Sequence, residues 1–192
     1  MKNYILIASA LLLTISLAGC KDNLTENKAE EIIKEKLKFP QTNTVDIAYG
    51  LIAFDSDSLP KYYYILQKKG MFDIKYLGIG GFLVLNHRFR ITPTKAAEKF
   101  ITQKDDKPIK QGGSGEFLYR SSFKTCEEQF DKIESIHEIP EVNGADVKYL
   151  VRKENFTPFW SYYLDETRKM PDSVRTRTFS FIKTNKGWIP YR

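Results

Sequence analysis

The sequence has only two cysteine and two histidine residues among its 192 residues. Metal clusters and disulfide frameworks need more of these residues, so both ways of stabilising a small domain are excluded. The sequence also lacks the GxSxG, HExxH and CxxC motifs, and its glycine-rich segments carry no GKS or GKT of a phosphate-binding loop. We therefore expect no cofactor, no metal ion and no catalytic residue.

The chain nevertheless has enough apolar material for a core, because 42% of its residues are hydrophobic and 14% are aromatic. This composition excludes a collagen-like or wholly disordered chain. Lysine and arginine number 30 against 24 acidic residues, which gives a formal net charge of +6. The length is compatible with one large domain or two small ones.

The N-terminal segment has the organisation of a secretory signal. Lys2 provides a positive charge, and residues 4–18 are uncharged and rich in leucine, isoleucine and alanine. This run is shorter than the roughly 20 helical residues that a bilayer core of about 30 Å requires. It fits the apolar region of a signal peptide.

The run ends in Leu17-Ala18-Gly19-Cys20, which resembles the lipobox of bacterial lipoproteins. The resemblance implies that residues 1–19 are a signal peptide, that cleavage occurs before Cys20, and that Cys20 is then acylated. Two or more acyl chains hold a protein stably on a membrane. The alternative is an ordinary signal peptide that carries an incidental cysteine.

The residues after Cys20 predict the location of such a lipoprotein. Lys21 stands where an inner-membrane retention signal would have aspartate, so we expect the outer membrane, facing either the periplasm or the cell surface. Lys21-Asp22 also resembles the start of the surface-export signal of Bacteroidota lipoproteins. Residues 20–24 form a tether of at most roughly 17 Å, which predicts a folded part close to the membrane.

The expected fold is α+β, and its first subdomain covers residues 25–102. Apolar residues at helical spacing predict an N-terminal helix capped by Asn23 or Thr25. Strands are expected at residues 45–54, 71–77 and 82–91, and helices at 59–69 and from Thr92-Pro93 to Ile101. The order of these elements after residue 59 resembles the back half of a winged-helix domain.

Residues 103–116 are expected to form a linker, because they show no apolar period and contain two glycines followed by Ser114 and a third glycine. Residues 117–192 are then a β-rich subdomain with an antiparallel sheet. Its last strands, expected at 174–182 and 188–191, resemble the end of a small cystatin-like α+β domain.

Two patterns within this C-terminal half concern its first hairpin. Asn143-Gly144 predicts a tight turn, and Val147, Tyr149 and Val151 alternate as in a strand with one buried face. Upstream of the turn, apolar residues recur at every third position, which fits neither a regular helix nor a regular strand. They are Phe130, Ile133, Ile136 and Ile139.

Cys126 and His137 are the one pair that could supply a thiol nucleophile and its base. If Cys20 is acylated, Cys126 has no disulfide partner and is either buried and inert or reactive. The pair carries the alternative function, a periplasmic hydrolase or thiol enzyme. His87 lies on an expected strand without a second ligand near it in the sequence.

Basic residues are concentrated at the C-terminus, where residues 166–192 contain seven lysines and arginines against two acidic residues. We take Arg175, Arg177, Lys183 and Trp188 as candidate partner-binding residues. Such a patch suits an acidic protein, a glycan or a lipid head group. The alternative is a strand that ends in solvent. Nucleic acid is not expected in this compartment.

These observations together predict a non-catalytic lipoprotein of the cell envelope. Its membrane partner is the bilayer that holds the lipid anchor, and its function is to bind another envelope component or protein. An immunity or inhibitor lipoprotein that protects the periplasm is one concrete form of this hypothesis.

Overall fold

The computed structural model describes residues 23–54, 57–80, 86–104, 107–111, 116–164 and 171–191. The predicted signal peptide, Cys20 and residues 112–115 of the predicted linker lie outside these ranges. Within them the fold is α+β, as the sequence predicts, with helices packed on one antiparallel sheet of nine strands. None of the described helices is long and apolar enough to cross a membrane.

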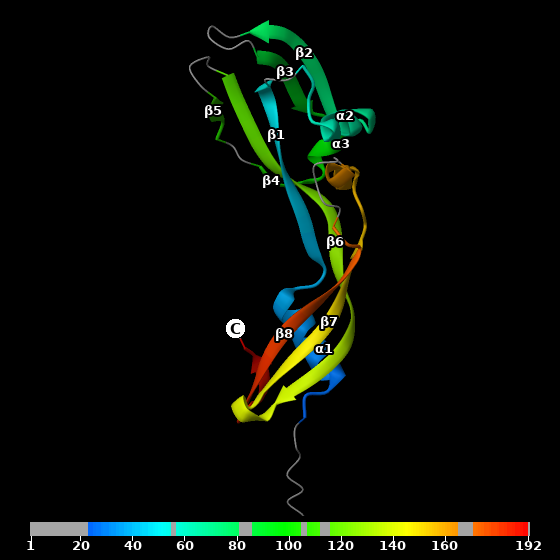
Figure 1. Ribbon diagram of the computed structural model, residues 1–192, viewed down its shortest axis with the longest axis vertical. Helices are drawn as coiled ribbons and strands as arrows, with labels where there is room; N and C mark the ends of the chain where they lie inside the picture. Colours follow the sequence, from blue (N-terminus) through cyan, green and yellow to red (C-terminus); the bar gives the residue numbers. More distant parts are fainter. Residues whose placement is uncertain are drawn as a thin grey trace, which may run out of the picture.

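The sheet is the framework of the molecule (Figure 1). The described elements are, in chain order, α1 (Glu26–Leu37), β1 (Gln41–Phe54), α2 (Lys61–Lys68), β2 (Phe72–Gly80), β3 (Asn86–Pro93), α3 (Lys95–Glu98), β4 (Ile101–Lys104), β5 (Ile109–Gln111), β6 (Glu116–Ile139), η2 (Pro140–Val142), β7 (Gly144–Glu154), η3 (Pro158–Leu164), β8 (Val174–Thr184) and β9 (Gly187–Pro190). In space the strands follow the order β2-β3-β1-β6-β7-β8-β9, and β4 and β5 also pair with β6.

The strand β6 accounts for the elongated shape of the molecule. Its 24 residues, at about 3.3 Å each, extend over roughly 80 Å. The first half of β6 pairs with β1 and the second half pairs with β7. One end of the molecule holds the start of α1 and the η2 turn, and the opposite end holds β2, β3 and β5 (Figure 1). We call them the α1 end and the β2 end.

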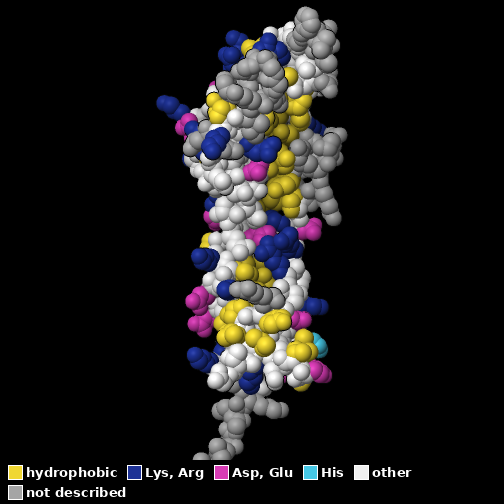
Figure 2. All heavy atoms as spheres, turned by 90° about the vertical axis from the view of Figure 1, so that its left-hand side faces the viewer, with side chains coloured by type: hydrophobic (Ala, Val, Ile, Leu, Met, Phe, Trp, Pro, Cys, Tyr) yellow, Lys and Arg dark blue, Asp and Glu magenta, His cyan; other side chains and the backbone are white. Residues whose placement is uncertain are grey.

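Two hydrophobic clusters lie along this framework. At the β2 end, α2 and η3 pack on the sheet around Phe72, Phe123 and Phe159, and the rings of Phe123 and Phe159 stack with centroids 4.3 Å apart. At the α1 end, α1 buries Ala29 and Ile33 against residues of β6, β7, β8 and β9. Figure 2 shows two groups of hydrophobic side chains on one face, with charged side chains between them.

The clusters do not follow the division of the chain at residues 103–116. The helix α1 belongs to residues 25–102, yet it packs with strands from residues 117–192. The described part of the predicted linker contains β5 and the end of β4, both paired with β6. Because β6 crosses both clusters, the two halves of the chain share one sheet.

Several predicted elements are confirmed. Thr25 caps α1, since its Oγ1 accepts a hydrogen bond from the backbone N–H of Lys28 at 3.3 Å. The helix α2 lies within the predicted residues 59–69. The alternating residues of β7 are buried as predicted, and β8 and β9 form the predicted final hairpin.

The three-residue spacing in β6 is explained by two β-bulges. The register with β7 shifts between Phe130 and Lys132 and again between Ile133 and Ser135. Each bulge adds one residue to β6 that has no partner opposite, so two residues of alternation become three. Phe130, Ile133 and Ile136 therefore all contribute to the cluster at the α1 end.

The prediction of a helix from Thr92-Pro93 to Ile101 is wrong in length. The helix α3 has only four residues, Lys95–Glu98, and Thr94 caps it by accepting a hydrogen bond from the N–H of Ala97. Ile101 instead begins β4 and pairs with Phe123 of β6. Pairing with β4 gives the backbone groups on this edge of β6 hydrogen-bond partners. A longer helix would leave those groups of β6 without partners from β4.

Candidate functional site

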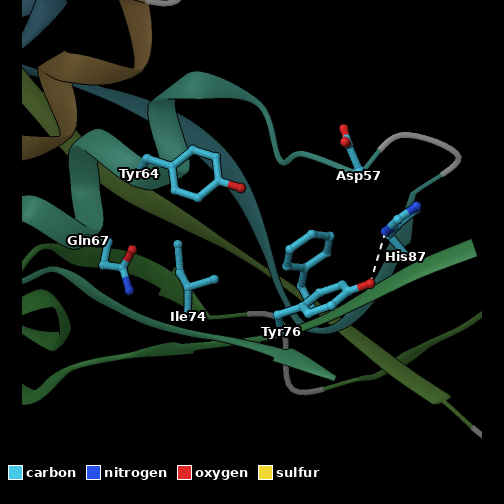
Figure 3. A pocket seen from close by; sticks show the side chains of 7 residues that line it. Asp57, Tyr64, Gln67, Ile74, Tyr76 and His87 are labelled. Carbon is cyan, nitrogen blue, oxygen red and sulfur yellow. Dashed lines mark hydrogen bonds between the residues drawn. The ribbon is translucent and has the colours of Figure 1, made fainter. Parts of the chain in front are cut away.

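An open groove of about 420 Å³ lies at the β2 end, between α2 and the β2–β3 hairpin (Figure 3). Its walls come from three parts of the chain: the segment before α2, the exposed side of α2, and one face of β2 and β3. The lining residues are Asp57, Tyr64, Gln67, Ile74, Tyr76, His87 and Phe89.

The helix α2 forms one wall because its two sides differ. Tyr63 and Leu66 are buried against the sheet, and the Tyr63 hydroxyl donates a hydrogen bond to the Ala48 carbonyl at 2.7 Å. This contact fixes the rotation of the helix, which leaves Tyr64 and Gln67 facing the groove (Figure 3).

The strands β2 and β3 form the floor of the groove. Ile74 and Tyr76 are two residues apart on β2 and therefore share a face, and Phe89 is the register partner of Tyr76 on β3. The ring centroids of Tyr76 and Phe89 are 5.2 Å apart. Phe89 is buried, whereas Tyr76 is 50% exposed, so the floor passes from core to open surface at Tyr76.

His87 holds the exposed tyrosine in place. Its Nδ1 lies 3.1 Å from the Tyr76 hydroxyl, within hydrogen-bond distance, and the two rings are stacked with centroids 6.0 Å apart. A tyrosine ring that is held at its hydroxyl and supported by Phe89 loses little conformational freedom when a ligand packs on it.

The groove combines flat apolar surface with hydrogen-bonding groups of both kinds. Tyr64, Tyr76 and Phe89 provide aromatic rings, the Asp57 carboxylate accepts hydrogen bonds, and the Gln67 amide both donates and accepts. No lysine or arginine is among the described residues that line it. Among the described residues no group of three or more His, Cys, Asp and Glu side chains could hold a metal ion.

The structure does not bring Cys126 and His137 together. Both lie on β6, eleven residues apart, which corresponds to more than about 30 Å of strand. Cys126 is buried and His137 is exposed. Burial raises the pKa of the Cys126 thiol, which also accepts a hydrogen bond from the Asn43 amide at 3.6 Å. Burial therefore favours the neutral thiol, and His137 is too far away to act as its base.

The four predicted partner-binding residues also do not form one patch. Arg175 and Lys183 are eight residues apart on β8, roughly 26 Å along the strand. Arg175 is exposed, whereas Lys183 lies near the α1 end with its Nζ 5.7 Å from the centroid of the Trp188 ring. Trp188 itself is buried.

The guanidinium group of Arg177 contacts other residues of the fold. It forms a salt bridge through Nη2 with the carboxylate of Glu128, and its Nη1 donates a hydrogen bond to the Gln41 side chain at 3.1 Å. Glu128 is almost completely buried, so Arg177 neutralises a charge within the fold. This pair lies between the two hydrophobic clusters.

Nothing in the local sequence singles out Tyr64, Gln67 or Tyr76, and His87 is a candidate there only as a metal ligand. The available signal was weak. Tyr76 alternates with Ile74 on an expected strand, and Tyr64 is one of three consecutive tyrosines. Only the rotation of α2 decides which tyrosines are buried and which face the groove.

No protein-family model, curated protein or solved structure matches this chain.

Proposed function

We propose that this chain is a non-catalytic, lipid-anchored envelope protein that binds an envelope component in the groove between α2 and the β2–β3 hairpin. The observation that carries the proposal is the position of the elements that line the groove: α2 and the β2–β3 hairpin lie toward the end of an elongated molecule opposite the start of α1 (Figure 1). An anchor at Cys20 would precede α1 by only a few residues.

The length of the sheet sets the distance between the groove and the proposed anchor. The strand β6 alone extends over roughly 80 Å, and the two hydrophobic clusters make it part of a continuous packed body. A protein anchored near α1 would hold the groove away from the bilayer. It could then reach a component that is attached elsewhere in the envelope.

The chemistry of the groove favours a glycan as the bound component. Sugar rings present flat apolar faces bordered by hydroxyl groups, which match exposed aromatic rings next to side chains that donate and accept hydrogen bonds. Tyr76 supplies the exposed ring, and Gln67 and Asp57 supply the polar groups. Because the described part of the lining contains no lysine or arginine, it favours a glycan without a high negative charge.

A capture experiment tests this proposal. The full lipidated chain is held in lipid nanodiscs on beads and exposed to solubilised envelope material, treated beforehand with either periodate or protease. Periodate cleaves the vicinal diols of sugars and should abolish capture, whereas protease should leave it intact. Capture that is sensitive to protease alone would contradict a glycan ligand and indicate a protein partner.

Two groove variants and one matched control localise the binding. Tyr76→Ala should weaken capture about five- to tenfold, the effect of losing one aromatic contact. Gln67→Ala should also weaken it, because the amide is exposed and lines the groove. Glu31→Ala is the control, since Glu31 is also exposed on a helix but lies at the other end. An equal loss in all three variants would rule out the groove.

A further inference from the structure

Two turns lie together at the α1 end of the molecule. One is η2 with Asn143, between β6 and β7, and the other joins β8 to β9. We call residues 140–144 and 183–189 the anchor-proximal tip. Val142 is 60% exposed and Ile189 is 43% exposed, which is high for aliphatic side chains. On the face seen in Figure 2, hydrophobic side chains are exposed at this end.

The tip is built as one unit. The backbone N–H of Lys183 donates a hydrogen bond to the carbonyl of Asn143 at 2.7 Å, which joins the two turns. Thr184 closes the second turn, since its Oγ1 donates to the carbonyl of Gly187 at 2.9 Å. Ile189 pairs with Ile182 in the adjacent strand, which in turn pairs with Gly144. The exposed aliphatic residues are therefore held on regular backbone.

The length of chain between Cys20 and the fold determines what can cover the tip. Asn23 is the first described residue, and Leu24 is already buried in the cluster at the α1 end. Four residues of extended chain reach at most about 14 Å. If Cys20 is acylated, the α1 end must therefore lie against the bilayer, nearer to it than the β2 end.

We propose that the anchor-proximal tip is a lipid-contacting surface, in which Val142 and Ile189 enter the interfacial region while Lys183 and Lys186 lie at the level of the phosphates. This inference rests on the proposed function, because it requires the acyl anchor at Cys20. Aliphatic side chains near lysines are typical of surfaces that rest in a bilayer interface.

The contact orients the protein rather than attaching it. Two aliphatic side chains are too few to hold a free protein on a membrane, but the acyl chains already supply attachment. Glu141 lies next to Val142, so we do not expect electrostatic attraction to dominate the contact. Fixing the tip on the bilayer would fix the direction in which the long sheet points, and with it the height of the groove.

The test uses the full lipidated protein in phosphatidylethanolamine and phosphatidylglycerol vesicles that contain spin-labelled lipids. Val142→Cys is labelled with a nitrobenzoxadiazole fluorophore, and Lys75→Cys, exposed on β2 at the other end, is the matched control. Labelling is selective because Cys126 is buried and the Cys20 thiol is acylated. The probe at position 142 should be quenched about twofold or more, and the probe at position 75 should be unaffected.

Each other result overturns the inference in a recognisable way. Protein that does not float with the vesicles would contradict the lipid anchor, and the proposed function would fail together with the tip. Protein that floats but shows no quenching at position 142 would overturn the tip alone. A blue-shifted but unquenched probe at position 142 would show that protein, such as a second copy of the chain, covers the tip instead of lipid.

Discussion

Replacing Arg177 with alanine should destabilise the fold by about 3 kcal/mol. The reason lies in its partner: Glu128 has a side chain that is only 2% exposed, and Arg177 forms the salt bridge that neutralises it. Removal of one partner of a buried pair typically costs about 3–5 kcal/mol, because the other charge is left without compensation. Arg177 is itself 25% exposed, so water can partly replace it, which places the expectation at the lower end.

Urea denaturation measures this effect, and Arg175→Ala is its control. Arg175 is two residues earlier on β8 and is exposed, so its loss should change the free energy of unfolding by less than about 0.5 kcal/mol. The double variant Glu128→Met with Arg177→Met should regain much of the stability, since neither member of the ion pair is then left buried without its partner. If Arg177→Ala and Arg175→Ala had equal, small effects, the internal role assigned to Arg177 would be refuted.

Three further predictions concern other parts of the chain. Burial raises the pKa of Cys126 above its ordinary value of 9.0, so the neutral thiol favours the folded state; this stabilisation is complete below about pH 9 and is lost as the pH rises through the folded-state pKa. The melting temperature should therefore fall less steeply between pH 8 and pH 11 in Cys126→Ala than in the unchanged protein. An equal fall of the melting temperature in both proteins would contradict this prediction. Gly78→Ala should lower the free energy of unfolding by about 1–2 kcal/mol, because Gly78 has a φ of +92°, where a side chain is strained, and an added Cβ would gain no packing contact in return. Chemical denaturation measures this change, and an unchanged midpoint would refute the prediction. Limited proteolysis should cut first within residues 112–115, as the glycine-rich sequence predicts, and a first cut elsewhere would contradict the predicted linker.

The elements that sequence reasoning predicted well are those with a strong local signal. Thr25 with its following helical period predicted α1, and the alternation of Val147, Tyr149 and Val151 predicted the buried face of β7. These patterns depend on residues within one or two turns or along one strand. Tertiary contacts reinforce them but do not change them.

The elements that could not be predicted depend on contacts far apart in the sequence. The bulges of β6 exist only because β7 pairs with it, so the spacing of Phe130 and Ile133 could not be assigned to a strand beforehand. The helix after Thr94 stops early because Ile101 pairs with β6. The packing of α1 on the C-terminal strands is likewise a consequence of the shared sheet.

The candidate site was missed for the same reason. The charge count drew attention to Arg175 and Arg177, but nothing in the local sequence shows that Glu128, almost fifty residues away, is buried and binds Arg177. The groove residues come from α2, β2 and β3 and meet only in the folded protein. Composition could indicate that aromatic residues are abundant, but not that Tyr76 stays exposed.

Site-specific photocrosslinking in intact cells tests the central claim, that an anchored protein binds its partner through the groove at the β2 end. A benzophenone amino acid is introduced at Gln67, beside the groove, or at Glu31, exposed on α1 at the other end. We predict a crosslinked adduct from position 67, sensitive to periodate, and none from position 31. An adduct from position 31 alone, or equal adducts from both positions, would contradict the account.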